Sequence, residues 1–444
     1  MRDRYRLDAV LILNQFYQGK IDFLEEGYNK FFAKYSYSPR ERGLLVSLIR
    51  GTVKTRIHLE GILRFYLSKW EKLPLSIQNL LRLALFQMIF HSGIPVFATV
   101  HEWVEVTKIL QDKGFVSLVN AVLRKAGEAV HSYRKRALGW SMVLPEWIEK
   151  EWEALFPDDR EDIKRSLMLP PETYIRVNTL RVGKAELRAR FESYGMLVEE
   201  ISDLPFTLRV QGDASELFAL PEWKEGFFYP QDVGSQMVTV LFSPSPGERV
   251  IDLCCGVGGK STAFAQLMGD RGEILAWDQN PKKIETLEHF ISCMGIKSII
   301  PAVVDILRPP EEFLGSADRV FLDAPCSGLG TLRRHPEILE RISQDTVKAL
   351  AEKQLHLLLS ASRLVKREGI ILYCVCTLSV EETEEVVRKF EAQTGGRFER
   401  VVGQEMTAPG KVLPFLNRTR DGGVFILPHR LRNDGFFVMV WKKK

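Results

Sequence analysis

The chain has 444 residues, of which 45% are apolar and 27% charged, which is the composition of an ordinary globular protein. This excludes wholesale disorder, a collagen-like repeat and a coiled coil, and the length predicts about three domains. No apolar run approaches the roughly 18 residues of a spanning helix, and the first residues do not resemble a signal peptide, so we expect no membrane association.

Positive charge is concentrated at the front of the chain. Residues 1–150 hold 23 Lys and Arg against 14 Asp and Glu, a net charge of +9, whereas the remainder carries −5. Such an excess predicts contact with a polyanion such as RNA or DNA. Many helical domains carry a similar excess without binding nucleic acid, so the charge alone leaves both interpretations open.

All six cysteines lie after residue 253. They are Cys254, Cys255, Cys293, Cys326, Cys374 and Cys376. Their spacing fits neither a zinc site nor a disulfide framework. We therefore predict a reduced, cytoplasmic protein without a bound metal, in which some thiols take part in chemistry.

Residues 1–138 are predicted to form an all-α bundle. The segment 38–41, Ser-Pro-Arg-Glu, has the form of a capping box with proline at the first helical position. Apolar residues recur at helical spacing after it and again at 80–88. The Arg-Lys-Arg run at 134–136 is expected in a linker or at an exposed helix end.

Residues 139–235 are predicted to form a linker helix and a small α+β module. The helix is expected to start at Pro145. A strand at 174–178, a helix at 183–195 and short strands near 198, 207–210 and 227–229 are expected to follow.

From 236 to 444 apolar strands alternate with helices, which is typical of a parallel α/β sheet of the Rossmann-like kind. Strands are expected at 249–253, 273–277, 298–303, 319–322 and 370–374. Helices are expected to start near residues 259, 281, 344 and 380. Segments 424–427 and 436–441 are expected to close the sheet as a hairpin.

A glycine-rich turn follows the first of these strands. It consists of Cys254, Cys255, Gly256, Val257, Gly258, Gly259 and Lys260. Glycines let the backbone approach a ligand, and the following helix N-terminus offers free N–H groups. Asp278, twenty residues after Gly258 at the end of the next strand, is placed to accept hydrogen bonds from a ribose.

This pattern predicts a nucleoside-containing cofactor. The spacing does not match a dinucleotide fingerprint, which favours S-adenosylmethionine over a nicotinamide cofactor. Asp305, just after the third strand, is either a contact for the adenine or a solvated acid at a strand end.

Two thiols follow two further strands. Asp323 and Cys326 follow the fourth strand, and Cys376 follows the fifth. Ligands of such sheets bind outside the carboxyl ends of the strands, so we expect both thiols to face the same crevice as the glycine turn. The segment 379–382, Ser-Val-Glu-Glu, has the form of a capping box, which predicts a helix N-terminus that would favour the thiolate of Cys376.

In combination, these residues resemble RNA 5-methylcytosine methyltransferases of the Sun/Fmu type. The motifs that carry the resemblance are 231–236, 252–260, Asp278, 323–327, 333–336 and 373–382. Residues 1–138 are similar to a NusB-type helical RNA-binding domain. The resemblance implies transfer of a methyl group from S-adenosylmethionine to carbon 5 of a specific cytosine in 16S small-subunit ribosomal RNA, through a covalent cysteine–cytosine intermediate.

The resemblance also implies residue roles. Residues 254–260, Asp278, Asp305 and Asp323 line the pocket for cofactor and base. Cys376 is the nucleophile and Cys326 assists product release. Asp323 would hold ring nitrogen 3 and the exocyclic amine of the base, and Lys260 completes the catalytic set.

The expected partner is small-subunit ribosomal RNA, with the target base single-stranded or flipped out, bound by a monomer. Residues 176–178 belong to a module that resembles an RNA-binding extension, and Arg333, Arg334 and His335 are expected to contact phosphates.

Four positions depart from the family pattern. Val257 and Val380 stand where proline is common, Cys255 where alanine is common and Cys374 where serine is common. None of these changes removes a reactive group, so they bear on cofactor affinity more than on activity.

Other functions fit parts of the sequence. The same chemistry on transfer RNA, a catalytically silent RNA-binding assembly factor and a nicotinamide oxidoreductase are the alternatives. The two thiols could also exchange roles, as in DNA cytosine methyltransferases. The presence of Asp323, Cys326 and Cys376 beside the glycine turn argues against a silent factor.

Overall fold

The computed structural model describes residues 4–110, 113–201, 204–212, 214–401, 415–419 and 422–444. The chain divides into two compact units. Unit 1 contains Met1–Pro145, Asp158–Pro170 and Leu332–Arg341, and unit 2 contains Glu146–Pro157, Pro171–Thr331 and Ile342–Lys444. Within the described ranges, no helix is long and apolar enough to cross a membrane.

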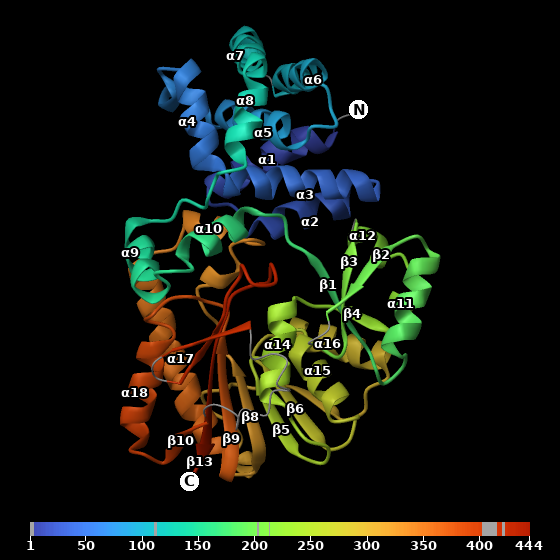
Figure 1. Ribbon diagram of the computed structural model, residues 1–444, viewed down its shortest axis with the longest axis vertical. Coiled ribbons are helices and arrows are strands. Elements are labelled where there is room, and N and C mark those ends of the chain that lie inside the picture. Colours follow the sequence, from blue (N-terminus) through green and yellow to red (C-terminus); the bar gives the residue numbers. More distant parts are fainter. Residues whose placement is uncertain (1–3, 111–112, 202–203, 213, 402–414, 420–421) are drawn as a thin grey trace. The chain divides into compact units, whose positions relative to one another are not determined.

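Unit 1 is helical (Figure 1). Its helices are α1 (Arg4–Tyr17), α2 (Leu24–Lys34), α3 (Pro39–Lys54), α4 (Arg56–Tyr66), η1 (Trp70–Lys72), α5 (Leu75–Phe90), α6 (Val96–Ile109), η2 (Lys113–Phe115), α7 (Val116–Glu128), α8 (Val130–Ala137), α10 (Arg160–Met168) and η5 (Pro336–Glu340). Helix α5 is apolar on nearly every side, and other helices of the bundle pack around it. Gly51 lets α3 approach α5, because a Cβ there would lie 2.0 Å from Cζ of Phe86.

The capping box predicted at residues 38–41 is confirmed. The Ser38 hydroxyl accepts from the Glu41 N–H at 3.3 Å, and the Glu41 carboxylate accepts from the Ser38 N–H at 2.8 Å. Two backbone donors that the first turn of α3 would otherwise leave unpaired are therefore satisfied.

The segment Leu332–Arg341 belongs to unit 1, although the chain on either side of it belongs to unit 2. Arg341 donates to the carbonyl of Ile21 at 2.6 Å, and Arg56 donates to the Glu340 carboxylate at 2.8 Å. These contacts hold the inserted segment against the helical bundle.

The small α+β module lies in unit 2. Its sheet is antiparallel, in the order β2 (Leu197–Glu200), β3 (Thr207–Gln211), β1 (Thr173–Val177) and β4 (Phe228–Pro230). Helix α11 (Lys184–Ser193) contacts β2, and α9 (Glu146–Leu155), α12 (Ala214–Leu217) and α13 (Pro221–Lys224) complete the helices of this part of the chain.

Among the described residues, the second sheet of unit 2 has nine strands. Its order is β11 (Leu416–Arg418), β12 (Val424–Ile426), β13 (Phe436–Lys443), β9 (Val365–Val375), β8 (Ala317–Asp323), β5 (Arg249–Leu253), β6 (Glu273–Asp278) and β7 (Ile299–Val303), with β10 (Phe398–Arg400) paired to β13. Strands β7, β6, β5, β8 and β9 are parallel, and β13 runs antiparallel to β9. The chain passes from β5 outward to β7 and then returns to β8 on the other side of β5. Open α/β sheets bind ligands at such a switch point.

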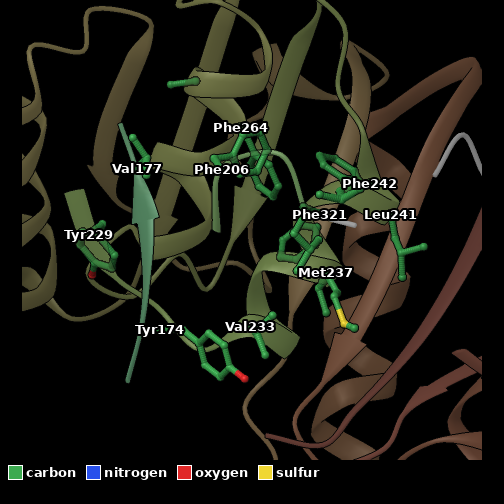
Figure 2. Packing of buried hydrophobic residues seen from close by; sticks show 14 of the residues in the cluster. Tyr174, Val177, Phe206, Tyr229, Val233, Met237, Leu241, Phe242, Phe264 and Phe321 are labelled. Carbon is green, nitrogen blue, oxygen red and sulfur yellow. The ribbon is translucent and has the colours of Figure 1, made fainter. Parts of the chain in front are cut away.

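Helices cover both faces of this sheet. In Figure 1, α14 (Val233–Phe242), α15 (Gly259–Leu267) and α16 (Pro281–Met294) lie on one face, and α17 (Gln344–Leu364) and α18 (Glu384–Thr394) on the other. The short helices η3 (Glu311–Phe313) and η4 (Leu329–Thr331) lie in the connections around β8. Figure 2 shows the core under α14 and α15, where the rings of Phe242, Phe264 and Phe321 pack with centroids 4.8–5.1 Å apart.

The predicted fold class is confirmed: an all-α N-terminal bundle, a small α+β module and a C-terminal Rossmann-like α/β sheet. The predicted closing pair is also confirmed, since β12 and β13 are antiparallel neighbours. The division at residues 138 and 235 stays a prediction.

Two predicted boundaries are wrong. Strand β9 begins at Val365 instead of 370, because exposed polar residues extend it beyond its buried part. The helix expected near residue 380 begins at Glu384.

Candidate active site

The glycine turn joins the carboxyl end of β5 to the start of α15. The backbone reverses through positive φ angles at Cys254 (61°), Gly256 (60°) and Gly258 (84°). A Cβ at Gly256 would meet nothing within 4 Å, so the turn borders open space at that residue. The first N–H groups of α15 follow, and such groups have no acceptor within their own helix. The turn therefore has the features of an anion or nucleoside cradle.

Arg176 supports this turn from the small antiparallel sheet. Its guanidinium donates at 2.6 Å to the carbonyl of Gly259, to Gln231 and to the Thr262 hydroxyl. Burial lowers the pKa of Arg176 to about 10. Within the module that resembles an RNA-binding extension, the Arg176 side chain is fully buried and holds the start of α15.

Asp278 and Asp305 follow the neighbouring strands β6 and β7. Asp278 is buried, and its carboxylate accepts from the N–H of Gly256 at 3.0 Å and of Asn280 at 2.9 Å. Asp305 is exposed and accepts from the Leu307 N–H at 3.1 Å. Asp278 therefore shapes the glycine turn directly, and each carboxylate retains further lone pairs for a ligand.

Lys260 and Asp323 form an ion pair at the switch point. The Lys260 ammonium lies 2.6 Å from the Asp323 carboxylate. Burial lowers the pKa of Lys260, but the Asp323 carboxylate together with Cys374 and Cys376 outweighs burial and holds that pKa above its usual value. Lys260 is therefore a fixed positive charge, close enough to Cys376 to interact with it electrostatically.

The sulfur atoms of Cys326 and Cys376 lie 3.1 Å apart. Neither residue is fully buried. The two loops that follow β8 and β9 therefore place their thiols side by side. The contact with Cys376, together with burial, raises the pKa of the Cys326 thiol well above its usual value.

Three other thiols near the turn are unsuited to nucleophilic chemistry. Burial raises the pKa of Cys254 to about 12, and burial also raises the pKa of Cys255 and of Cys374. A neutral thiol is a poor nucleophile. Cys326 and Cys376 differ from these neighbours in that their sulfur atoms contact each other.

A buried glutamate ties the two cysteine loops together. The Glu382 carboxylate accepts from the Ser327 N–H at 2.8 Å, from the Gln354 amide at 2.9 Å and from the Thr377 hydroxyl at 3.2 Å. The hydroxyls of Ser327 and Thr377 are themselves 2.7 Å apart. Ser327 follows Cys326 and Thr377 follows Cys376, so Glu382 fixes the spacing of both thiols.

The capping box expected at residues 379–382 is therefore wrong. The Glu382 side chain turns inward to the cysteine loops instead of back to Ser379, whose hydroxyl donates to Glu151 at 3.2 Å. Because α18 begins only at Glu384, Cys376 does not lie at a helix N-terminus. Sequence reasoning missed Glu382 because its pattern fits a common local motif.

Asp252, near the end of β5, is a second buried acid. Its carboxylate accepts from the Ser261 hydroxyl at 2.5 Å, and its other oxygen has no hydrogen-bond partner among the described residues. Burial raises the pKa of Asp252 to about 7. The acid holds the first turn of α15 against β5, directly beneath the glycine turn.

The motif at 333–336 lies outside this site, in unit 1. Arg333 is only 1% exposed and donates to the Ser166 hydroxyl at 2.5 Å. The expectation that Arg333 contacts RNA phosphates is wrong, because its guanidinium is buried in the bundle. Arg334 and His335 are partly exposed. Among the residues that the structure describes, no cluster of His, Cys, Asp and Glu could hold a metal ion.

The comparisons with known proteins agree along the whole chain. A family model described as 16S rRNA methyltransferase RsmB/F matches residues 239–442, the NusB family model matches 4–128, and a model of the ferredoxin-like domain of RsmF/B-like methyltransferases matches 144–215. The probable ribosomal RNA small subunit methyltransferase B of Bacillus subtilis is 34% identical over 418 residues, covering 92% of each chain. That of Thermus thermophilus is 31% identical over 358 residues, covering 80% of this chain and 79% of the relative.

Solved structures share the fold. The crystal structure of PH0851 has a TM-score of 0.78 at 25% identity and covers 99% of both chains. The crystal structure of NSun6 from Pyrococcus horikoshii with SFG has a TM-score of 0.58 at 22% identity, covering 67% of this chain and 98% of that one.

The fold and the site together define an α/β methyltransferase joined to a NusB-type helical domain. Within that class, the chain belongs to the family of ribosomal RNA small subunit methyltransferase B.

Proposed function

We propose that the chain transfers a methyl group from S-adenosylmethionine to carbon 5 of a cytosine in small-subunit ribosomal RNA, through a covalent bond between Cys376 and the base. The observation that carries this proposal is the pair of thiols 3.1 Å apart, beside the Lys260–Asp323 ion pair and the glycine turn. A hydride-transfer role gives no function to this paired arrangement.

The residues around the turn fit the cofactor. The backbone at 254–260 leaves open space at Gly256, and Asp278 at the end of β6 has lone pairs suited to a ribose diol. Asp305 is the candidate for the adenine, and Asp323 lies where cofactor and base would meet. When bound, S-adenosylmethionine supplies an electrophilic methyl group.

Carbon 5 of cytosine is a weak nucleophile, and the chain must activate it. Addition of the Cys376 thiolate to carbon 6 makes the ring enamine-like, so that carbon 5 could accept the methyl group, with S-adenosylhomocysteine as the leaving group. A positive charge beside a thiol favours its thiolate form, and Lys260 supplies that charge. A neutral Cys326 thiol can in addition donate a hydrogen bond to the Cys376 sulfur.

The Asp323 carboxylate, held by Lys260, would accept hydrogen bonds from the exocyclic amine and from ring nitrogen 3 once addition has left a proton on that nitrogen, which stabilises the charge that develops there. After transfer, carbon 5 loses its proton to a base, for which a water molecule near the neutral Cys326 thiol is the candidate. The bond between sulfur and carbon 6 then breaks, which regenerates the Cys376 thiolate and releases methylated RNA.

The substrate assignment rests on the family and on charge. We propose that residues 1–138, which carry most of the net positive charge, contact ribosomal RNA, that 139–235 form an RNA-binding module, and that 236–444 hold the chemistry. We also propose that the protein acts in the cytoplasm as a monomer on a single-stranded or flipped-out base.

Cysteine variants test the mechanism. The Cys376→Ala variant should lose both methyl transfer and covalent RNA capture, whereas Cys326→Ala should accumulate a protein–RNA adduct that denaturing gels detect. Cys293→Ala, in α16, is the matched control and should behave as wild type. An adduct that accumulates in Cys376→Ala, together with loss of both methyl transfer and covalent capture in Cys326→Ala, would reverse the two roles.

Bisulfite mapping tests the product. Ribosomal RNA from cells with the active chain should show a protected cytosine that is absent with Cys376→Ala. Protection confined to transfer RNA would overturn the substrate, and no protection in any RNA would overturn the reaction.

A further inference from the structure

Unit 1 carries a hollow that the proposed reaction does not use. It has a volume of about 480 Å³, and α4, α8 and the segment after α8 form its walls. The residues that line it include His58, Gly61, Phe65, Tyr133, Arg136 and Trp140.

Flat aromatic groups form one wall of the hollow. The rings of His58 and Trp140 are stacked, with centroids 4.5 Å apart and planes inclined by 7°. The His58 ring is fixed by a 3.0 Å hydrogen bond between Nε2 and the Ser141 carbonyl, and Phe90 packs edge-on against Trp140 with centroids 5.8 Å apart. This wall is therefore held in place before any ligand arrives.

An exposed phenylalanine stands at the same hollow. Phe65 is 83% exposed, so its ring contributes little to the core. Its neighbour Tyr66 points inward and shares a hydrogen bond with Tyr133, 2.6 Å between hydroxyl oxygens. The last turn of α4 is thus anchored by Tyr66 and leaves the Phe65 ring available to a ligand.

A glycine keeps the hollow open. Gly61 lies in the middle of α4, where glycine is disfavoured relative to alanine. No close packing requires it, because a Cβ there would meet nothing within 4 Å. A side chain at this position would instead project into the hollow.

The charge at the hollow is positive. Arg136 lines it and is exposed, and Lys135 beside it in the chain is also exposed. Within the described ranges, no carboxylate lines the hollow. Stacking surfaces next to a guanidinium are the combination that binds a base and its phosphate in single-stranded nucleic acid.

We propose that this hollow binds an unstacked base of a single-stranded RNA segment, with the base against Phe65 and Trp140 and a flanking phosphate on Arg136. The inference rests on the proposed function for the identity of the RNA, since it makes the hollow a second contact for the same substrate. It assigns a specific site to the basic excess of the N-terminal region.

Direct binding tests the site. Fluorescence anisotropy would use the full-length chain, without cofactor, and a labelled single-stranded RNA of about 12 nucleotides. Phe65→Ala removes one stacking contact and should therefore weaken RNA binding roughly tenfold. Phe65→Tyr should restore it, and Phe97→Ala, an equally exposed phenylalanine on α6 (78%), should bind as wild type.

Two further variants separate stacking from folding. Gly61→Leu should fill the hollow and weaken binding while the helical content of unit 1 is kept. Arg136→Gln removes one phosphate contact, so the slope of log Kd against log salt concentration should fall by roughly the amount that one contact contributes. On an RNA of the same length that lacks bases, Phe65→Ala and wild type should bind equally.

The outcome can be told apart from failure of the proposed reaction. With ribosomal RNA as substrate, Phe65→Ala should raise KM and leave kcat unchanged. Normal RNA binding and KM in Phe65→Ala and Gly61→Leu would overturn the site even if cytosine is methylated, and would favour a protein ligand for the hollow. A wild-type chain that binds RNA through Phe65 but methylates no cytosine would instead overturn the reaction and leave the site standing.

Discussion

The helical bundle and the catalytic sheet bury acidic groups in different ways. In unit 1, Glu60 is 8% exposed and faces cations, with Arg82 at 2.7 Å and Arg56 at 3.2 Å. In unit 2, Glu382 is fully buried and accepts only from uncharged donors, and Asp252 accepts from a single hydroxyl.

This difference in charge compensation distinguishes acids that stabilise the fold from acids that position the reactive groups. In the bundle, ion pairs compensate the charge of Glu60, whereas Glu382 and Asp252 form no ion pair among the described residues. Burial raises the pKa of Glu382, and burial raises the pKa of Asp252 to about 7. Unpaired buried acids are costly and concentrate at functional sites. In this chain they hold the glycine turn and the two cysteine loops in place.

The largest effect should come from the ion pair at the site itself. Lys260→Met removes the cation beside Asp323 and Cys376, so the rate of methyl transfer at saturating RNA should fall about 100- to 1,000-fold. Single-turnover kinetics measure this. Lys283→Met, which removes a half-exposed lysine 3.5 Å from Asp278, is the control and should change the rate only a few-fold. A Lys260→Met enzyme with normal kinetics would mean that Asp323 needs no cation.

The bundle should depend on charge compensation. Glu60→Gln leaves Arg82, which is 6% exposed, without its anion, and should lower the free energy of unfolding by about 3 kcal/mol. Urea denaturation measures the loss. Glu146→Gln breaks an exposed pair with Lys150 and should cost less than about 1 kcal/mol. Equal losses in both variants would contradict the contrast drawn between the two units.

Asp252 should make stability depend on pH. Its pKa is raised in the folded chain to about 7, so the folded state binds a proton that the unfolded state has already lost above about pH 4. Its contribution to stability should therefore fall as pH rises from about 4 to 7. In the wild type, titration of Asp252 should lower the free energy of unfolding by roughly 2 kcal/mol between pH 5 and 7, and this decrease should be absent in Asp252→Asn.

Denaturation of both chains at the two pH values measures this difference. Because other acids titrate in the same range, the quantity compared is wild type minus Asp252→Asn. A difference that does not change with pH would show that Asp252 stays ionised.

The smallest effect should come from a glutamate-to-glutamine change at Glu382, although the same type of change should be costly at Glu60 in the bundle. Glu382→Gln keeps an oxygen for the Ser327 N–H and the Gln354 amide, and should change stability by less than about 1 kcal/mol. Glu382→Ala removes all three acceptor contacts, should cost about 2 kcal/mol and should slow methyl transfer. Covalent capture by Cys376 reports the position of the thiols. Equal damage from Gln and Ala would mean that the charge of Glu382 is required.

Local patterns predicted most of the secondary structure. Pro281 at the start of α16, the capping box of α3 and the apolar strand β5 each lie where the sequence placed them. The predictions that failed rested on local patterns that are compatible with two different structures. The Ser379–Glu382 motif fits a helix cap, but Glu382 finds three buried donors from other segments, and those partners are invisible in the order of the chain.

The candidate site divides in the same way. The glycine turn, Asp278, Asp323 and the two thiols follow from their positions after predicted strands. The contact between Cys326 and Cys376 joins residues 50 positions apart, and only the parallel pairing of β8 with β9 brings them together. Arg176 illustrates the opposite case, because an arginine in a strand can equally contact solvent or RNA until packing buries it.

The sequence by itself determined the order of elements, the chemistry of the reactive groups and the uneven charge. These depend on residue type and on neighbours a few positions away. Tertiary structure decided which acids lie without a cation, which arginines are buried and how closely the two sulfurs approach. Those properties depend on burial and on contacts between distant segments, and both arise only when the sheets and helices pack.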